Sequence, residues 1–405
     1  MRKIYSFNEV LVVIFVIGMF FSGFLKTSVS NIFGYIDEIL VIFFIVIYML
    51  KILLKKKRKI TKESLIIIAN SMLLIIIGFI GNLVSEYQNS TGAIIIDMFS
   101  WLKFFGTFAL LYEIININKI EKYFKLMDKL AKFFVILGYI IYALILMGKI
   151  FAGSRYGIQV FYLGGHPSFA CAFYATIISF LMHDHKKNII WIILAMILEL
   201  LTLRSKAFGF CFLVVLLVIF LRKKISFNKI FIAMLGVVFF VWERISYYFL
   251  DVTASRAVAL ITSFKIFKNF FPIGSGFATY GTVMSGTFYS KAYYIYGLSN
   301  RWGFSTVNSS FIGDGGLATI IGQFGFIGCL IFLVNIIILV EILIKLVKRY
   351  DGKIIDIIAL VGYIGISCTN EIFFNSDIAV IFAIVLVILI KKYIVEEETE
   401  KKNYE

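Results

Sequence analysis

The sequence is poor in charged residues and in proline, and both shortages limit the classes of protein to which it can belong. Only 16% of its 405 residues are charged and 61% are hydrophobic, whereas about 25% of a soluble globular domain is charged. The composition therefore indicates a membrane protein. The two prolines, Pro167 and Pro272, fall at the start of an apolar run and in a long loop, so neither interrupts a run.

The few cysteines give no sign of a disulfide framework or of a thiolate metal site. All four of them, Cys171, Cys211, Cys329 and Cys368, lie within apolar segments and show no metal-ligand spacing. We therefore expect small buried apolar residues at these positions, with no metal and no cofactor.

Long apolar runs predict an all-α fold, a polytopic bundle of about twelve transmembrane helices. The runs cover roughly residues 9–25, 36–54, 64–84, 93–114, 133–151, 166–182, 188–203, 207–221, 230–249, 312–342, 354–372 and 377–395. We expect one transmembrane domain over residues 1–395 and a disordered cytoplasmic tail over residues 396–405. Residues 121–130 have the pattern of a basic amphipathic helix lying on membrane lipid.

The net charge is +16, and the basic residues behind it are spread unevenly along the chain, in a pattern that predicts its orientation in the membrane. With both ends of the chain in the cytoplasm, 28 of the 40 Lys and Arg residues fall in cytoplasmic segments, 11 fall outside or at outer span ends, and Lys103 lies within a span. This asymmetry follows the positive-inside rule. The basic charge therefore predicts orientation in the membrane, and it does not predict a nucleic-acid partner.

One outer loop is far longer than the others and covers residues 250–311. A loop of this length in a compact bundle is usually a lid or a binding element. Residues 257–270 mix apolar and basic side chains at helical spacing, so we expect the loop to be partly helical.

Four basic residues are candidates for an anion site on the outer side. Arg204 and Lys206 share a tight turn between two spans, and a guanidinium can bind a phosphate with two parallel hydrogen bonds. A snorkelling arginine or an ion pair with Glu199 explains Arg204 equally well. Arg256 and Lys265 predict a cationic surface on the loop helix, or simply a solvated helix face.

Two further residues are candidates for proton transfer. His166 is the only outer imidazole under this topology and could serve as a base or bind a phosphate or sugar, although a structural capping role is an alternative. Asp314 stands at the outer mouth of a span, where a carboxylate is costly unless it is used or paired. A helix N-cap or an ion pair explains Asp314 as well as a catalytic base does.

Taken together, these stretches resemble the O-antigen polymerase and ligase family of polytopic glycosyltransferases. The matching pieces are Leu203-Arg204-Ser205, the run from Ser255-Arg256 through Pro272-Ile273-Gly274-Ser275-Gly276, and residues 314–328. Gly165-His166-Pro167-Ser168 is similar to the family's Gly-x-Pro-Asn, with Ser168 in the place of Asn. Asp314 stands where the ligase branch often has a His-Asn pair ahead of a Gly-x-x-Gly, here Gly325 and Gly328, so the resemblance favours a polymerase.

The resemblance implies a reaction at the outer face of a bacterial cytoplasmic membrane. Oligosaccharide repeat units on polyprenyl pyrophosphate would be joined when an acceptor hydroxyl attacks the anomeric carbon of the donor and the lipid pyrophosphate leaves. Arg204, Lys206, Arg256 and Lys265 would stabilise that leaving group, and Asp314 or His166 would accept the proton.

For the sugars, the resemblance implies stacking on Tyr280, Tyr289, Tyr293 and Trp302. It also implies a chain-length regulator and a flippase as partner proteins. A lipid-linked oligosaccharide flippase or another transporter remains the competing class, and a ligase remains an alternative within the family.

Overall fold

The computed structural model describes residues 34–54, 60–163, 166–220, 254–350, 354–368 and 373–404, with a few isolated residues besides. Most of these residues are helical, so the expected all-α class is confirmed. The strands in this part of the chain are β1 (Ser154–Arg155) and β2 (Ile158–Gln159), which pair as an antiparallel hairpin. The predicted spans 9–25 and 230–249 lie outside the described residues.

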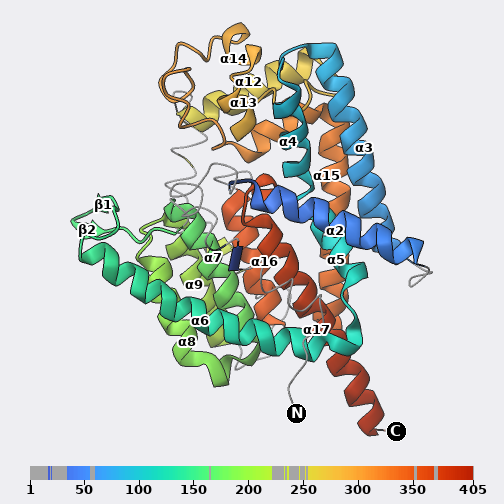
Figure 1. Cartoon of the computed structure of the whole chain (residues 1–405), viewed down its shortest axis with the longest axis vertical. Helices are drawn as coiled ribbons and strands as arrows, with labels where there is room; N and C mark the ends of the chain where they lie inside the picture. Colours follow the sequence, from blue (N-terminus) through green and yellow to red (C-terminus); the bar gives the residue numbers. More distant parts are fainter. Residues whose placement is uncertain are drawn as a thin grey trace.

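The helices form two groups that the last two helices join (Figure 1). One group holds α2 (Ile36–Leu53), α3 (Lys62–Ser85), α4 (Thr91–Leu102), α5 (Phe105–Ile114) and α15 (Gly316–Arg349). The other holds α6 (Ile120–Leu146), α7 (Pro167–Leu181), α8 (His185–Leu200) and α9 (Ser205–Phe220). Between them lie α16 (Ile355–Cys368), which packs on α7 and α9, and α17 (Ala379–Tyr404), which packs on α5 and α6. Short 3-10 turns are η2 (Ile117–Lys119), η3 (Met182–Asp184) and η4 (Phe373–Asn375).

The long loop is partly helical, as expected. It contains α12 (Ser255–Asn269), α13 (Val283–Thr287) and α14 (Lys291–Ile295), which gather at one end of α4 and α15 (Figure 1). Its core is formed by side chains of the loop itself and of the first turn of α15, among them Ile266, Tyr280, Tyr293, Phe304 and Ala318. The loop is therefore a small folded cap on the bundle.

In the part of the chain that the structure describes, three helices are long and apolar enough to cross a membrane, over residues 62–85, 117–146 and 316–349. A fourth span results if α4 and α5, bent by 55°, are counted together. The number twelve is thus not supported. The 15 residues of α7 and the 16 residues of α8 cover only about 22–24 Å at 1.5 Å per residue, which is less than the about 30 Å hydrocarbon core.

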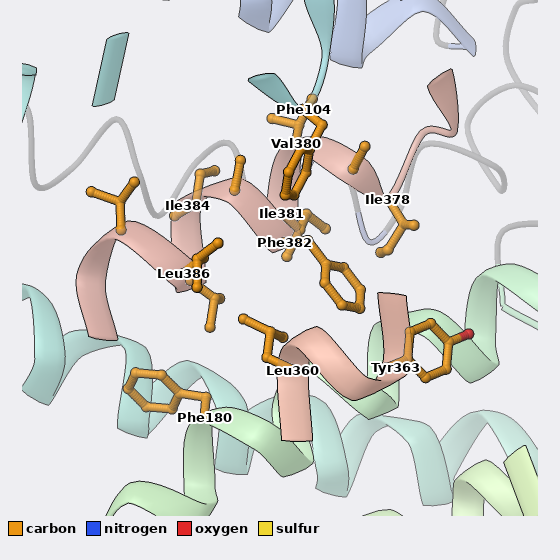
Figure 2. Close-up of a cluster of buried hydrophobic side chains, with 14 of the residues drawn as sticks. Phe104, Phe180, Leu360, Tyr363, Ile378, Val380, Ile381, Phe382, Ile384 and Leu386 are labelled. Atoms are coloured by element: carbon orange, nitrogen blue, oxygen red, sulfur yellow. The ribbon is translucent and has the colours of Figure 1, made fainter. Parts of the chain in front are cut away.

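The core between the two groups is built around α17. Figure 2 shows the apolar side chains of Ile378 and of the first turns of α17, up to Leu386, lying among Phe104, Phe180, Leu360 and Tyr363. From Ala379 to Ile390 every side chain of this helix is buried. A helix that is apolar on all sides is expected in the centre of a bundle, and α17 takes that place.

Hydrogen bonds and ion pairs connect segments that the distribution of Lys and Arg places on the same side of the membrane. On the predicted cytoplasmic side the pairs are Lys345 with Glu63, Lys392 with Glu121, Asn188 with Asp128, and His183 with Asp356. On the predicted outer side, the Lys291 N–H donates to the Tyr87 carbonyl at 3.0 Å, and the Phe161 N–H donates to the Leu201 carbonyl at 2.9 Å. The fold is therefore consistent with the predicted division of these segments between two sides.

Two expected boundaries are wrong. Residues 121–130 do not form a separate surface helix, because α6 continues without a break from Ile120 to Leu146. The expected disordered tail is helical up to Tyr404, since α17 continues through it. In both cases a charged stretch is the end of a longer apolar helix.

Candidate functional site

The loop glycines are needed for a close backbone contact with α15. The Ser275 N–H donates to the Gly322 carbonyl at 3.0 Å, and the Gly276 N–H donates to the Gln323 carbonyl at 2.8 Å. A Cβ on Gly274, which has φ +77°, would lie 2.5 Å from the Gln323 oxygen. Only glycine permits this approach, so the Gly274-Ser275-Gly276 stretch joins the loop to the bundle.

The partner of this turn is a kink in α15. Gly325 has φ 58° and ψ −150°, which is outside the helical region and is adopted essentially by glycine alone. The kink frees the Ile327 N–H to donate to the Pro272 carbonyl at 3.1 Å. The two glycine motifs singled out in the sequence are thus two halves of one structural junction.

His166 stands at the start of α7. Its side chain caps the helix, because the imidazole Nδ1 accepts the Ser168 N–H at 3.2 Å, and Pro167 follows as the first helical residue. The structural role considered as the alternative for His166 is therefore present. It uses one ring nitrogen and leaves the exposed Nε2 for another contact.

Arg204 meets that second nitrogen. It lies at the turn that leads into α9, where Leu203 adopts a left-handed φ of 51° and the Ala207 N–H donates to the Arg204 carbonyl. The Arg204 Nη2 lies 3.2 Å from the His166 Nε2. Two residues that the sequence placed in separate motifs, 38 positions apart, therefore form one pair on the predicted outer side.

The donors and acceptors of this pair conflict, and an anion would resolve the conflict. Arginine only donates, and a neutral imidazole has one N–H and one acceptor nitrogen. If Nδ1 accepts from Ser168, the proton is on Nε2 and faces the guanidinium, donor against donor. An oxygen that accepts from both groups suits this arrangement, and the N-termini of α7 and α9 add favourable dipoles for negative charge.

Arg155 adds a second cation beside the Arg204–His166 pair, and sequence analysis missed it. Its Nη1 is 3.5 Å from the Leu203 carbonyl, and it projects from the exposed β1–β2 hairpin. In the sequence, Arg155 counted only as one outer charge among others. The available signal was the length of the link after residue 151, which exceeds that of most outer links.

Lys206 lies next to the pair but inside the protein. It is 4% exposed, its ammonium is 6.0 Å from the centre of the Tyr363 ring, and its charge interacts with Glu199. The Glu199 carboxylate is itself fully buried between the thiols of Cys171 and Cys211, at 3.6 and 3.9 Å. Lys206 is thus placed as a buried counter-charge, which does not fit direct contact with a pyrophosphate.

Arg256 and Asp314 lie at a different place, near the packing of α12 on the start of α15. A Cβ on Gly315 would lie 3.6 Å from the Ala259 Cβ, and Arg256 precedes Ala259 by three residues on the same face of α12. Both candidate residues are half-buried. Lys265 is exposed on α12, as the alternative of a solvated helix face requires.

The loop aromatics divide into core and surface residues. Tyr280 and Tyr293 are each 1% exposed and stack on each other at 5.9 Å, and their hydroxyls are hydrogen-bonded to the Ala259 carbonyl and to Ser285. Burial raises the pKa of both hydroxyls. Half-buried Tyr289 donates to the Phe304 carbonyl at 2.7 Å, whereas Trp302 is 71% exposed. Placement therefore favours Trp302 as a stacking surface and makes the first two tyrosines core residues.

Asp97 is the buried carboxylate to which sequence reasoning gave too little weight. It lies in α4, is 1% exposed, and accepts hydrogen bonds from the Ala278 N–H at 2.6 Å and from Gln323 Nε2 at 3.1 Å. Its only signal in the sequence was a negative charge within an apolar run. The contacts show that it helps to hold the loop against α15.

No family model, curated protein or solved structure matches this chain. The described residues contain no group of three or more His, Cys, Asp or Glu side chains arranged to hold a metal ion. The functional assignment therefore rests on the geometry of the outer sites.

Proposed function

We propose that the protein is a membrane glycosyltransferase that joins oligosaccharide repeat units carried on polyprenyl pyrophosphate, at the outer face of a bacterial cytoplasmic membrane. The observation that carries the proposal is the 3.2 Å approach of Arg204 to His166 at two helix N-termini. Arg155, whose Nη1 lies 3.5 Å from the carbonyl of the neighbouring Leu203, would be a third donor to the pyrophosphate in this proposal. The shorter apolar helices, such as α9 and α16, belong to the membrane bundle in this proposal.

The chemistry needs a leaving group that is stabilised as its charge develops. The acceptor hydroxyl attacks the anomeric carbon, the glycosidic bond to the phosphate breaks, and the lipid pyrophosphate leaves with the electron pair. Donors that are already fixed when the charge forms lower the barrier most effectively. His166 is fixed by its cap to Ser168, and Arg204 by the turn that starts α9.

Asp314 or His166 accepts the hydroxyl proton in this proposal. The two residues are associated with different sites, Asp314 with the α12–α15 junction and His166 with Arg204. Because His166 serves the anion, Asp314 is the stronger candidate base. A positioned base contributes roughly 10²–10⁴-fold to rate.

The test compares Asp314→Asn with His166→Ala, using purified lipid-linked repeats in reconstituted membranes. Asp314→Asn is expected to reduce turnover and to leave lipid-linked substrate binding unchanged, whereas His166→Ala is expected to weaken binding as well. Wild-type turnover in both variants would refute the proposed site.

A transporter of lipid-linked oligosaccharide is the second candidate, and the break between α4 and α5 favours it. Discontinuous helices with charged residues at the break are typical of substrate or ion sites in secondary transporters. Lys103 and Phe104 occupy the break here. Deletion of the gene separates the two functions, because loss of polymer with single repeats retained supports a polymerase, whereas loss of all surface repeats supports a transporter.

A further inference from the structure

A buried charge cluster lies at the break between α4 and α5, away from the outer anion site. The Lys103 ammonium forms an ion pair with Asp37, a second one with Glu38 at 2.8 Å, and a longer one with Asp377 at 3.5 Å. Asp37 and Glu38 come from the first turn of α2, and Asp377 from the link before α17. Three separate parts of the chain therefore meet at one ammonium group.

The buried part of the cluster has more acid than base. Asp37 and Lys103 are each 2% exposed and Glu38 is 9% exposed, whereas the Asp377 side chain is 61% exposed and therefore solvated. With both buried acids ionised, two negative charges would face one positive charge. An uncompensated charge in this environment costs several kcal/mol, so a cation must balance it.

An unsatisfied oxygen points to the same conclusion independently. Glu38 Oε1 accepts from Ser100 Oγ at 3.0 Å and contacts Lys103. The other oxygen, Oε2, is buried and receives no hydrogen bond from any residue that the structure describes. A protonated neighbouring carboxyl is a donor that would satisfy it.

We propose that Asp37 and Glu38 bind one exchangeable proton between their carboxyl groups, which makes the α4–α5 break a proton site within the membrane. The proton comes from water beside Asp377, and its binding forms an O–H bond on one carboxyl that donates to the other. The remaining negative charge is balanced by Lys103. Loss of the proton leaves net negative charge next to the break and favours its opening to water.

The charged groups around the pair support a proton over a metal ion. They are Lys103 from the break and Asp377 from the link before α17, and Asp97 lies one turn before Ser100 on α4. The ammonium already occupies the position between the acids that a metal ion would take. Because acids also bind sodium, the test must still distinguish proton binding from sodium binding.

Infrared spectroscopy of the purified full-length protein in lipid nanodiscs tests this site directly. The wild type is expected to show the band of a protonated, desolvated carboxylic acid at neutral pH, and the band is expected to shift in D₂O. Glu199 and Asp97 are buried acids that can contribute to the same band, so the test compares variants with the wild type. Asp37→Asn and Glu38→Gln should each remove the same component of the band, because the remaining acid then pairs with Lys103 in its ionised form. Lys103→Met should strengthen it, because both acids must then be protonated.

The matched control is Asp184→Asn, which removes an exposed acid and should leave the band unchanged. If the band is absent from the wild type, or if neither Asp37→Asn nor Glu38→Gln reduces it, the proposal is wrong. If it appears only after sodium is removed, the site binds a metal cation. These outcomes do not depend on glycosyltransferase activity, so failure here leaves the proposed function untouched.

Discussion

The side-chain amide of Asn82 forms hydrogen bonds with both the N–H and the carbonyl of Phe277. Its Nδ2 donates to the Phe277 carbonyl at 2.8 Å, and its Oδ1 accepts the Phe277 N–H at 2.8 Å. Asn82 is in α3, whereas Phe277 is in the long loop. This double hydrogen bond fastens the loop to a helix that is distant in the sequence.

Asn82→Ala should therefore loosen the loop. Both backbone groups of Phe277 would remain buried without a partner, at a cost of about 1–3 kcal/mol each. Thermal unfolding should occur at lower temperature and proteolysis within residues 272–290 should be faster. Asn118→Ala, at an exposed position, is the control and should match the wild type.

Gly325→Ala should damage the junction from the other side. The backbone conformation at residue 325 costs a residue with a side chain about 1–3 kcal/mol, and the new Cβ would lie 2.6 Å from both the Gly274 nitrogen and the Pro272 oxygen. Folded protein should accumulate at a much lower level. At Gly365 no atom lies within 4 Å of the added Cβ, so normal accumulation of Gly365→Ala would show that the loss is local.

Replacement of Arg204 should impair polymer formation even when the charge is kept. Arg204→Lys retains a point charge but loses the planar fork that reaches a pyrophosphate and His166 together. Loss of one charged hydrogen bond is worth about 1.5–3 kcal/mol, or roughly ten- to a hundredfold in substrate affinity. The measurement is binding of the lipid-linked donor by the purified variant. Full affinity in Arg204→Ala, with Lys149→Ala as the exposed outer control, would reduce Arg204 to a surface residue.

The stability of the end of the bundle that holds His183, predicted to be cytoplasmic, should fall at high pH. Burial alone would lower the pKa of His183, but hydrogen bonds to Asp356 and Glu396 raise it to about 9 from 6.5. A pKa that is raised in the folded state contributes stability that is fully present below 6.5 and is lost as the pH rises through about 9. The melting temperature of the wild type should exceed that of His183→Asn at neutral pH, and the difference should shrink above pH 9. A constant difference over this range would contradict the assignment.

Topology can be checked with reporter fusions. Fusions after Lys187 and Lys348 should report the cytoplasm, and fusions near Asn89 and Tyr289 should report the outside. The last two positions should agree with each other, because the Lys291 N–H bonds to the Tyr87 carbonyl. Opposite locations for Asn89 and Tyr289 would be incompatible with this fold. Fusions after Lys57 and Lys224, at positions outside the described residues, should also report the cytoplasm.

Helix positions were largely readable from the sequence because an apolar run must form backbone hydrogen bonds internally in a membrane. The run at 64–84 corresponds to α3 at Lys62–Ser85, and the helical pattern at 257–270 corresponds to α12 at Ser255–Asn269. The described helices do not support twelve spans, because hydropathy does not distinguish a short buried helix from one that crosses the membrane. For example, the 18 residues of α2 include three charged residues, Asp37, Glu38 and Lys51, which is unfavourable for a helix that crosses the hydrocarbon core.

The candidate site was only partly predictable because its meaning lies in contacts between distant segments. His166 and Arg204 could each be selected by position and chemistry, but nothing in the sequence indicated that they touch. Tyr280 and Tyr293 looked like sugar platforms because they lie in an outer loop, yet that loop has a core of its own and they fill it. Lys103 was recognised as a charge within a span, whereas its partners on α2 could not be seen.

The double attachment of residues 272–279, to α3 through Asn82 and to the kink of α15 through Gly276, has a consequence for how a substrate arrives. A segment whose backbone is hydrogen-bonded to both α3 and α15 is not free to open as a hinged lid. Under the proposed function the lipid-linked substrate lies in the bilayer, so it would enter laterally between helices without any such movement. In that case the cap stays in place over the site, and the substrate enters below it, between the helices of the bundle.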